Sequence, residues 1–327
     1  MRVLLLGATG TIGQATTQAL VSSGHEVVCL VRNQFVGDGT HSKTTTPISF
    51  NGAEIHFGNP LDIRSVLSEK WIGQPFDALV SCLASRKGTP RDAWAIDYQA
   101  HSEWLQLAKS KGIKHFVLLS AMCVQKPLLE FQRAKLAFEN ELIASGLIYS
   151  IVRPTAFFKS LSGQINRLQQ GKPFLLFGDG QLTACKPISD QDLGQFMANC
   201  LTEKNLHHAV LPIGGPGPAI TPLQQANMLF GELGKPPLYQ HVPIRLLDAV
   251  IVLLKSLGMF VPACADKAEL AKIGRYYATE SMLVWDPKKS AYDEQATPSF
   301  GTHTLLEHYQ HILRNHMDIN LGQHSVF

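Results

Sequence analysis

The stretch GATGTIG, from Gly7 to Gly13, follows a short apolar run and precedes the amphipathic segment QATTQALVSSG. This order of strand, glycine-rich turn and helix is the context in which a dinucleotide is bound. Gly7 permits the turn, Gly10 lets the backbone approach a pyrophosphate, and Gly13 allows the helix to pack closely on the strand. Free N–H groups at the helix start face the phosphate charge. We therefore predict dinucleotide contacts from Gly7, Thr9, Gly10, Thr11, Ile12 and Gly13.

The first half of the chain alternates short apolar runs with helix-length segments, as expected for strands that are buried on both faces. This alternation predicts an α/β fold of Rossmann type, with a doubly wound parallel sheet and a smaller C-terminal substrate region. The predicted strands are Arg2–Gly7, Glu26–Val31, Ala53–Phe57, Asp77–Leu83, His115–Ala121 and Ile148–Pro154.

The alternation weakens beyond Pro154, and the Pro- and Gly-rich segment Leu211–Pro222 reads as a loop that leads into a second region. We predict an NADPH-binding Rossmann domain at residues 1–155, with its sheet completed by segments up to about residue 215. Residues 156–327 are predicted to bind mainly the substrate. The polar segment Gln34–Gly52 is predicted to be a long loop near the adenine end of the nucleotide.

Composition excludes several classes of function. Lys and Arg are dispersed along a chain of net charge +3, so no nucleic-acid partner is expected. The six cysteines include no C-x-x-C pair, and His308 and His311 have no carboxylate at metal-site spacing, so no metal centre is expected. Because the first strand begins at residue 2, no signal peptide is expected. The scattered cysteines make a reducing, cytoplasmic location the default.

The most apolar later segment is Leu246–Val261, which is short for a membrane span and contains Lys255. A buried or dimer-forming helix is favoured there over a helix at a membrane interface. No transmembrane segment is expected, and the sequence gives no indication of oligomeric state.

The end of the second predicted strand indicates which dinucleotide is bound. NAD-specific sites place Asp or Glu there to bind the ribose 2′-hydroxyl, whereas this chain has Val31, Arg32 and Asn33. A guanidinium without an acid favours a 2′-phosphate, so NADPH is the predicted cofactor and Arg32 its ligand. A solvated surface arginine is the alternative.

Segments that follow other strands emerge at the carboxyl ends of the sheet, where ligands of open α/β sheets bind. Ala84 and Ser85 in CLASRKG are small enough to lie against a cofactor. Further cofactor contacts are predicted from Leu83, Ala84, Ser85, Ser120 and Pro154.

The stretch PLLEFQRAKLAFE reads as a helix in which Phe131 and Lys135 share one face. Many nucleotide-dependent reductases carry Tyr-x-x-x-Lys here, with the phenol delivering the proton that accompanies hydride transfer. A phenylalanine stands at the tyrosine position of this chain. A lysine on an apolar face must be paired, extended to water or functional. We predict that Lys135 contacts the nicotinamide ribose and takes part in catalysis.

The chain resembles the NADPH-dependent 3,8-divinyl (proto)chlorophyllide 8-vinyl reductases, which are atypical short-chain dehydrogenases/reductases, in GATGTIG, SCLASRKG, FVLLSAMCVQKPLLEFQRAKLAFE, YSIVRPTAFFKSLSGQ, FGDGQLTACKPIS, LPIGGPG and KIGRYYATESML. The resemblance implies NADPH and reduction of the C8 vinyl group of a magnesium chlorin or porphyrin to ethyl during chlorophyll synthesis. It also implies pyrophosphate contact from the glycines and ribose contact from Lys135. Many related enzymes have Gly-Asp after the third strand, where this chain has Gly58-Asn59, so adenine contact there stays open.

Loss of the phenol is compatible with this reaction, because reduction of a conjugated vinyl group forms no alkoxide that needs a proton. Phe131, Phe157 and Phe158 are predicted to offer flat apolar surface to the macrocycle, with plain core packing as the alternative. Arg153 is predicted to bind the substrate carboxylate, and Lys126 and Arg86 are further candidates.

The proton donor is predicted to be Tyr276, since a tyrosine near neutral pH stays protonated; Tyr277, Cys123 and water are alternatives. Two rival functions remain open at this point. One is an NADPH-binding sensor or photosystem assembly factor of the same fold, and the other is a reductase of another conjugated substrate. An amphiphilic tetrapyrrole substrate is compatible with peripheral contact to photosynthetic membranes.

Overall fold

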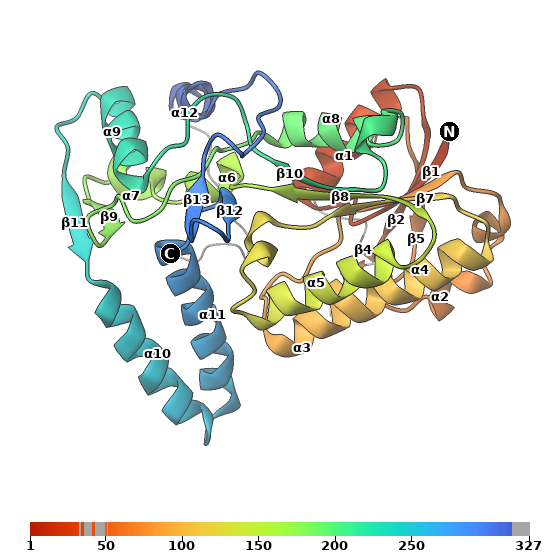
Figure 1. Cartoon of the computed structure of the whole chain (residues 1–327), viewed down its shortest axis with the longest axis horizontal. Coiled ribbons are helices and arrows are strands. Elements are labelled where there is room, and N and C mark those ends of the chain that lie inside the picture. Colours follow the sequence, from red (N-terminus) through yellow and green to blue (C-terminus); the bar gives the residue numbers. More distant parts are fainter. Residues whose placement is uncertain (33, 36–40, 43–49, 51, 316–327) are drawn as a thin grey trace.

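The computed structural model describes residues 1–32, 34–35, 41–42, 50 and 52–315. At its centre is a parallel sheet of seven strands in the order β10-β8-β7-β6-β1-β2-β5 (Figure 1). All six predicted strands are present within two residues of their predicted ends, so the predicted Rossmann-type fold is confirmed. The strands are β1 (Arg2–Leu6), β2 (Glu26–Val31), β5 (Glu54–Phe57), β6 (Ala78–Ser81), β7 (His115–Leu119), β8 (Ile148–Pro154) and β10 (Ala209–Ile213).

Helices cover both faces of the sheet because successive strand residues are apolar on both sides. Val3 and Leu5 of β1 pack on one face with α1 (Thr11–Ser22) and α8 (Asp190–Asn199). Leu4 and Leu6 belong to the core of the other face. The helical elements associated with that second layer are α2 (Arg64–Leu67), η1 (Lys70–Gly73), α3 (Pro90–Ala93), the π-helix η2 (Trp94–Ala100), α4 (His101–Ser110), η3 (Met122–Gln125) and α5 (Glu130–Ile143).

The seventh strand, β10, lies far along the chain and pairs in parallel with β8. Leu211–Ile213 belong to this strand, so the prediction of a loop from Leu211 was wrong for its first three residues. A parallel strand needs a long crossover connection, and the chain between β8 and β10 supplies it through α8 and a short turn, η4 (Lys204–Leu206).

The C-terminal region has a core of its own, formed by apolar side chains between two strands and several helices. β9 (Phe174–Phe177) and β11 (Tyr239–Val242) pair in parallel, and β12 (Val284–Asp286) and β13 (Ala291–Asp293) form an antiparallel pair. The helices of this region are α6 (Phe158–Leu161), α7 (Ile165–Gln169), α9 (Pro222–Leu233) and α12 (Leu305–Arg314).

A helical hairpin projects from the rest of the molecule (Figure 1). It consists of α10 (Ile244–Gly258) and α11 (Pro262–Thr279), which pack against each other. α10 contains no buried residue, so the alternative of a buried helix at Leu246–Val261 was wrong. Among the described residues, no helix is long and apolar enough to cross a membrane.

Most of the polar segment Gln34–Gly52 lies outside the described residues, as does Asn33. Within it, β3 (Gln34–Phe35) and β4 (His41–Ser42) form a short antiparallel pair.

Candidate functional site

The glycine-rich turn is closed tightly by its surroundings. Gly7 has φ +77°, and a Cβ on it would lie 2.6 Å from the carbonyl carbon of Cys82. A Cβ on Gly13 would lie 2.1 Å from the carbonyl oxygen of Gly7. Larger residues would therefore push the turn away from β6 and α1 away from β1.

The start of α1 is suited to a phosphate. Gly10 caps the helix without a side-chain hydrogen bond, and the first turn contains no acid. The N–H groups of Thr11, Ile12 and Gly13 thus form an uncapped helix end, where a pyrophosphate fits both the donors and the helix dipole.

Lys159 brings a cation to the same place. It comes from α6, far from the glycine-rich turn in the sequence, and its Nζ lies 3.3 Å from Oγ1 of Thr11. Burial raises the pKa of the neighbouring Asp190 carboxyl to about 6, and Lys159 opposes that shift. Sequence reasoning missed Lys159, because only the folded chain places it beside the turn.

Two arginines emerge from strands on either side of β1. Arg32 follows β2 and Arg86 lies beyond β6, and both are exposed. Partial burial and, secondarily, the charge of Arg86 lower the pKa of Arg32. Two guanidinium groups at this edge are suited to a phosphate dianion.

Lys135 is paired with a buried acid. Its Nζ lies 3.0 Å from Oδ1 of Asp97, and the side chains are 11% and 0% exposed, respectively. Asp97 also accepts hydrogen bonds from the backbone N–H and the hydroxyl of Ser85. The structure thus brings two predicted site residues, Ser85 and Lys135, together through an acid that the sequence analysis missed. The sequence feature that could have indicated this acid is that Asp97 is the single carboxylate in the largely apolar stretch WAIDYQA.

Behind this group lies a neutral histidine. His101 Nδ1 is 2.9 Å from the carbonyl of Ile96, and its Nε2 is 2.8 Å from Oγ of Ser81. Burial, followed by the charge of Lys135, lowers the pKa of His101 to about 4. Near neutral pH the histidine therefore adds no positive charge beside Lys135.

A second buried acid binds the predicted carboxylate ligand. Arg153 forms an ion pair with Glu139, whose side chain is 1% exposed. The hydroxyl of Ser120, predicted to contact the cofactor, donates to the same carboxylate. Arg153 therefore has an internal partner with which a substrate carboxylate would have to compete. Pro154, the last residue of β8, is buried and pairs with Ile213 of β10.

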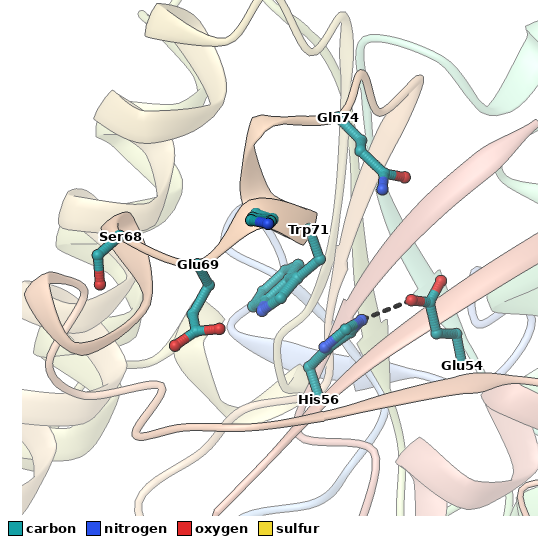
Figure 2. Close-up of a pocket in the computed structure, with 7 residues that line it drawn as sticks. Glu54, His56, Ser68, Glu69, Trp71 and Gln74 are labelled. Atoms are coloured by element: carbon teal, nitrogen blue, oxygen red, sulfur yellow. Dashed lines mark hydrogen bonds and ion pairs between the residues drawn. The ribbon is translucent and has the colours of Figure 1, made fainter.

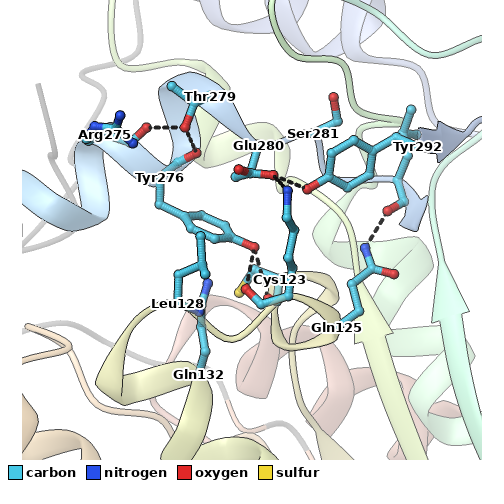
Figure 3. A network of polar contacts seen from close by, with 12 residues as sticks. Cys123, Gln125, Leu128, Gln132, Arg275, Tyr276, Thr279, Glu280, Ser281 and Tyr292 are labelled. Atoms are coloured by element: carbon cyan, nitrogen blue, oxygen red, sulfur yellow. Dashed lines mark hydrogen bonds and ion pairs between the residues drawn. The ribbon is translucent and has the colours of Figure 1, made fainter. Parts of the chain in front are cut away.

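The C-terminal region closes over the loop after β7 through a polar network (Figure 3). Tyr276 is 3% exposed, and its hydroxyl donates to the carbonyl oxygens of Cys123 and Lys126 at 3.0 and 3.3 Å. Lys126 Nζ lies 2.6 Å from Glu280 and 4.5 Å from the centre of the Trp285 ring. Lys126 thus has an internal partner too, and Tyr276 is held as an anchor of α11.

The three predicted aromatic residues lie in different cores. Phe131 is 8% exposed and packs with Ile273 and Tyr276. Phe158 is 4% exposed inside the C-terminal core, and Phe157 packs half-buried against the core on the α1 face of the sheet. The structure therefore does not gather them on one open surface.

A hollow of about 500 Å³ lies at the edge of the sheet (Figure 2). Trp71, stacked on His56 with ring centroids 4.7 Å apart, and Glu54 are among its lining residues. Glu54 also meets Arg2, the first residue of β1. This is the amino end of the strands, whereas ligands of open α/β sheets bind at the carboxyl ends.

Among the described residues, no cluster of His, Cys, Asp or Glu is arranged to hold a metal ion.

Solved structures share the fold. An isoflavone reductase superposes with a TM-score of 0.66 at 18% identity, over 95% of this chain and 99% of its own. The NADPH-dependent quinone oxidoreductase QOR2 of Escherichia coli gives 0.63 at 19% identity, over 95% and 99%.

Sequence relatives are more informative about family. Residues 7–204 match a family model described as NAD(P)H-binding, which confirms the predicted class of cofactor. Divinyl chlorophyllide a 8-vinyl-reductase of Cucumis sativus is 48% identical, over 99% of this chain and 79% of its own length. The enzyme of that name from Arabidopsis thaliana is 47% identical, over 97% and 78%. Photosystem II assembly factor Ycf39 of Synechocystis is only 24% identical, over 66% and 63%. The resemblance found in the sequence is thus confirmed, and the chain belongs to the NAD(P)H-binding family of divinyl chlorophyllide a 8-vinyl reductases.

Proposed function

We propose that this protein reduces the C8 vinyl group of divinyl chlorophyllide or protochlorophyllide to ethyl with NADPH. The observation that supports it most is the identity of 46–48% to reductases so named, over 97–99% of the chain. The reaction adds one hydride and one proton across the C=C bond.

NADPH is the proposed reductant because Arg32 and Arg86 offer two guanidinium groups, and no acid, to a 2′-phosphate. The uncapped start of α1 and Lys159 would bind the pyrophosphate. When bound, the nicotinamide supplies the hydride.

Lys135 is proposed to bind the nicotinamide ribose. An ammonium group has three donors, so the ion pair with Asp97 leaves others for ribose hydroxyls. Because Asp97 is fixed by Ser85, the lysine is held in one orientation before the cofactor arrives.

The carbon-bound proton requires a different source from the phenol of carbonyl reductases. Hydride added at the terminal vinyl carbon leaves negative charge spread into the macrocycle, and protonation follows at carbon. Burial raises the pKa values of Tyr276 and Cys123, so both remain protonated at neutral pH. Tyr276 would have to release two carbonyl acceptors to act, so the Tyr277 hydroxyl, the Cys123 thiol and water are competing donors.

Substrate contacts are proposed at Phe131 and Phe157, with Phe158 supporting them from the C-terminal core. Phe131 is covered by Ile273 of α11. Access of the macrocycle to Phe131 would therefore require displacement of α11. Arg153 could meet a substrate carboxylate only beside Glu139. The location is proposed to be cytoplasmic, with peripheral contact to photosynthetic membranes.

An assay with divinyl chlorophyllide and NADPH tests the proposal by the pigment's absorption and chromatographic mobility. We expect conversion to the monovinyl pigment. Absence of conversion by folded, NADPH-binding protein would contradict it and favour a non-catalytic assembly role, for which the distant likeness to Ycf39 is the supporting observation. Reduction of a different conjugated substrate alone would point to the other rival function.

A further inference from the structure

The outer face of α10 carries an apolar stripe with no partner among the described residues. Leu246, Val250, Leu253 and Leu257 are spaced by four, three and four positions, which places them on one side of the helix. They are 38–59% exposed. α10 packs on α11 through another side, where Asp248 pairs with Arg275 and a Cβ on Gly258 would lie 2.9 Å from Cα of Ala265, so the stripe is not used to form the hairpin.

The stripe runs into the tip of the hairpin. Met259, Phe260 and Val261 are 76%, 83% and 47% exposed, and they follow α10 directly. Figure 1 shows this tip at the point of the hairpin farthest from the sheet. Three consecutive apolar side chains at a projecting turn can enter an apolar phase without moving the rest of the molecule.

The charges of the hairpin suit an anionic surface. Asp248 is neutralised by Arg275, and Glu269 by Lys272. In the described part of the hairpin, the exposed cations Arg245, Lys255 and Lys267 form no ion pair, and Asp266 is the one acid that forms none. Basic residues on an element that also carries an exposed apolar stripe are the pattern of helices that lie in a lipid interface.

The base of the hairpin leads to the candidate site. Ile273 and Tyr276 of α11 pack with Phe131, while Tyr276 is also bonded to the loop after β7. A surface bound at the tip would thus lie at the far end of a helix whose base covers the proposed substrate contacts.

We propose that the α10–α11 hairpin inserts its tip and the outer stripe of α10 into the interfacial layer of an anionic lipid bilayer. A second copy of the chain could cover the stripe. A dimer interface on the stripe would not explain, however, why three apolar residues are exposed at a projecting turn near cations that form no ion pair. The bilayer accounts for the stripe, the tip and the charges together. This binding requires neither pigment nor cofactor.

The full chain would be floated with vesicles of phosphatidylglycerol and phosphatidylcholine, and separately with phosphatidylcholine alone, without pigment or NADPH. Binding to the anionic vesicles is expected, weakened by salt. The combined change Met259→Ser, Phe260→Ser and Val261→Ser should weaken it at least about tenfold. The matched control Leu67→Ser alters a 50%-exposed leucine on α2, away from the hairpin, and should leave binding unchanged.

Charge is tested by Arg245→Gln with Lys255→Gln, which should weaken binding to anionic vesicles about fivefold per charge and leave binding to neutral vesicles unaltered. As a depth probe, Phe260→Trp should give a blue-shifted emission only with vesicles. Absence of flotation, or equal flotation of the triple variant, would overturn the proposal. So would a wild-type dimer that the triple variant dissociates without any vesicle binding. Because no pigment is present, none of these outcomes depends on the reductase assignment.

Discussion

At the scale of single residues, the site depends on how one lysine is held. The motif of related reductases explains why a lysine is present at position 135, but its surroundings come from Asp97 and Ser85. A buried ammonium is costly unless paired, and a buried carboxylate equally so. The pair therefore satisfies both charges while it fixes the lysine's direction.

Lys135→Met should lower the free energy of unfolding by about 3–5 kcal/mol, because it leaves Asp97 buried without its cation. Adding Asp97→Asn should restore most of that stability. Turnover should stay at least about 100-fold below wild type in both variants, since the ribose ligand is absent. Urea unfolding and steady-state kinetics on the single and double variants check this. A double variant with wild-type turnover would contradict the assignment of Lys135.

Arg32→Ala and Arg86→Ala should each raise the KM for NADPH about 10- to 100-fold and change the KM for NADH little, since only the 2′-phosphate is lost as a partner. Initial rates with each dinucleotide measure how the change in KM differs between NADPH and NADH. Arg91→Ala, at an exposed position on α3, is the matched control. Equal effects on both dinucleotides would argue against a phosphate site at this edge.

At the scale of elements, two short segments set the geometry around Lys135. The π-helix Trp94–Ala100 carries Asp97 toward Ser85, and irregular turns of this type often occur at functional sites. α11 covers the other side and is held there through Tyr276. Each segment thus makes a contact between residues distant in sequence: Asp97 of the π-helix with Lys135, and Tyr276 of α11 with Cys123.

Tyr276→Phe separates an anchoring hydroxyl from a proton donor. As an anchor, it should cost about 1–3 kcal/mol of stability, because carbonyls of Cys123 and Lys126 lose a donor, with turnover retained within about tenfold. If the Tyr276 hydroxyl were instead the proton donor, its removal should lower kcat about 100-fold or more. Thermal unfolding and single-turnover rates distinguish the two. Full turnover in both Tyr276→Phe and Tyr277→Phe would leave Cys123 or solvent as the proton source.

His101 should make the protein sensitive to acid. Its pKa is lowered from 6.5 to about 4, so between these pH values the unfolded chain binds a proton that the folded protein does not. The contribution of neutral His101 to the free energy of unfolding is complete above about pH 6.5. It falls by about 3 kcal/mol in all as the pH is lowered toward 4. His101→Gln should flatten that part of the pH profile in urea unfolding. An unchanged slope would show that His101 takes up its proton equally in the folded and the unfolded protein, which would contradict the lowered pKa.

At the scale of the whole molecule, the sequence allowed prediction of the sheet because its strands are continuous apolar runs, as at β1 and β7. The prediction that segments up to about residue 215 complete the sheet gave no bounds for β10, because its first four residues, Ala209–Pro212, are only partly buried and the strand adjoins a Pro- and Gly-rich stretch. Motif spacing identified Lys135 and the glycine turn. Asp97 and Lys159 escaped because their roles depend on contacts across the fold.

Core membership was likewise hidden from the sequence. Phe157 and Phe158 are neighbours in the chain, yet they face different cores because α6 begins between them. Arg153 was visible as a cation, but its buried partner Glu139 comes from another element.

The central claim is hydride transfer to the vinyl group, and deuterium transfer tests it most directly. Divinyl chlorophyllide would be incubated with the protein and NADPH deuterated at the transferred position, and the pigment analysed by mass spectrometry and NMR. The account predicts a monovinyl product with a single deuterium in the C8 ethyl group, formed by wild type and lost with Lys135→Met together with Asp97→Asn. Recovery of unlabelled divinyl pigment from folded, NADPH-bound protein would contradict it.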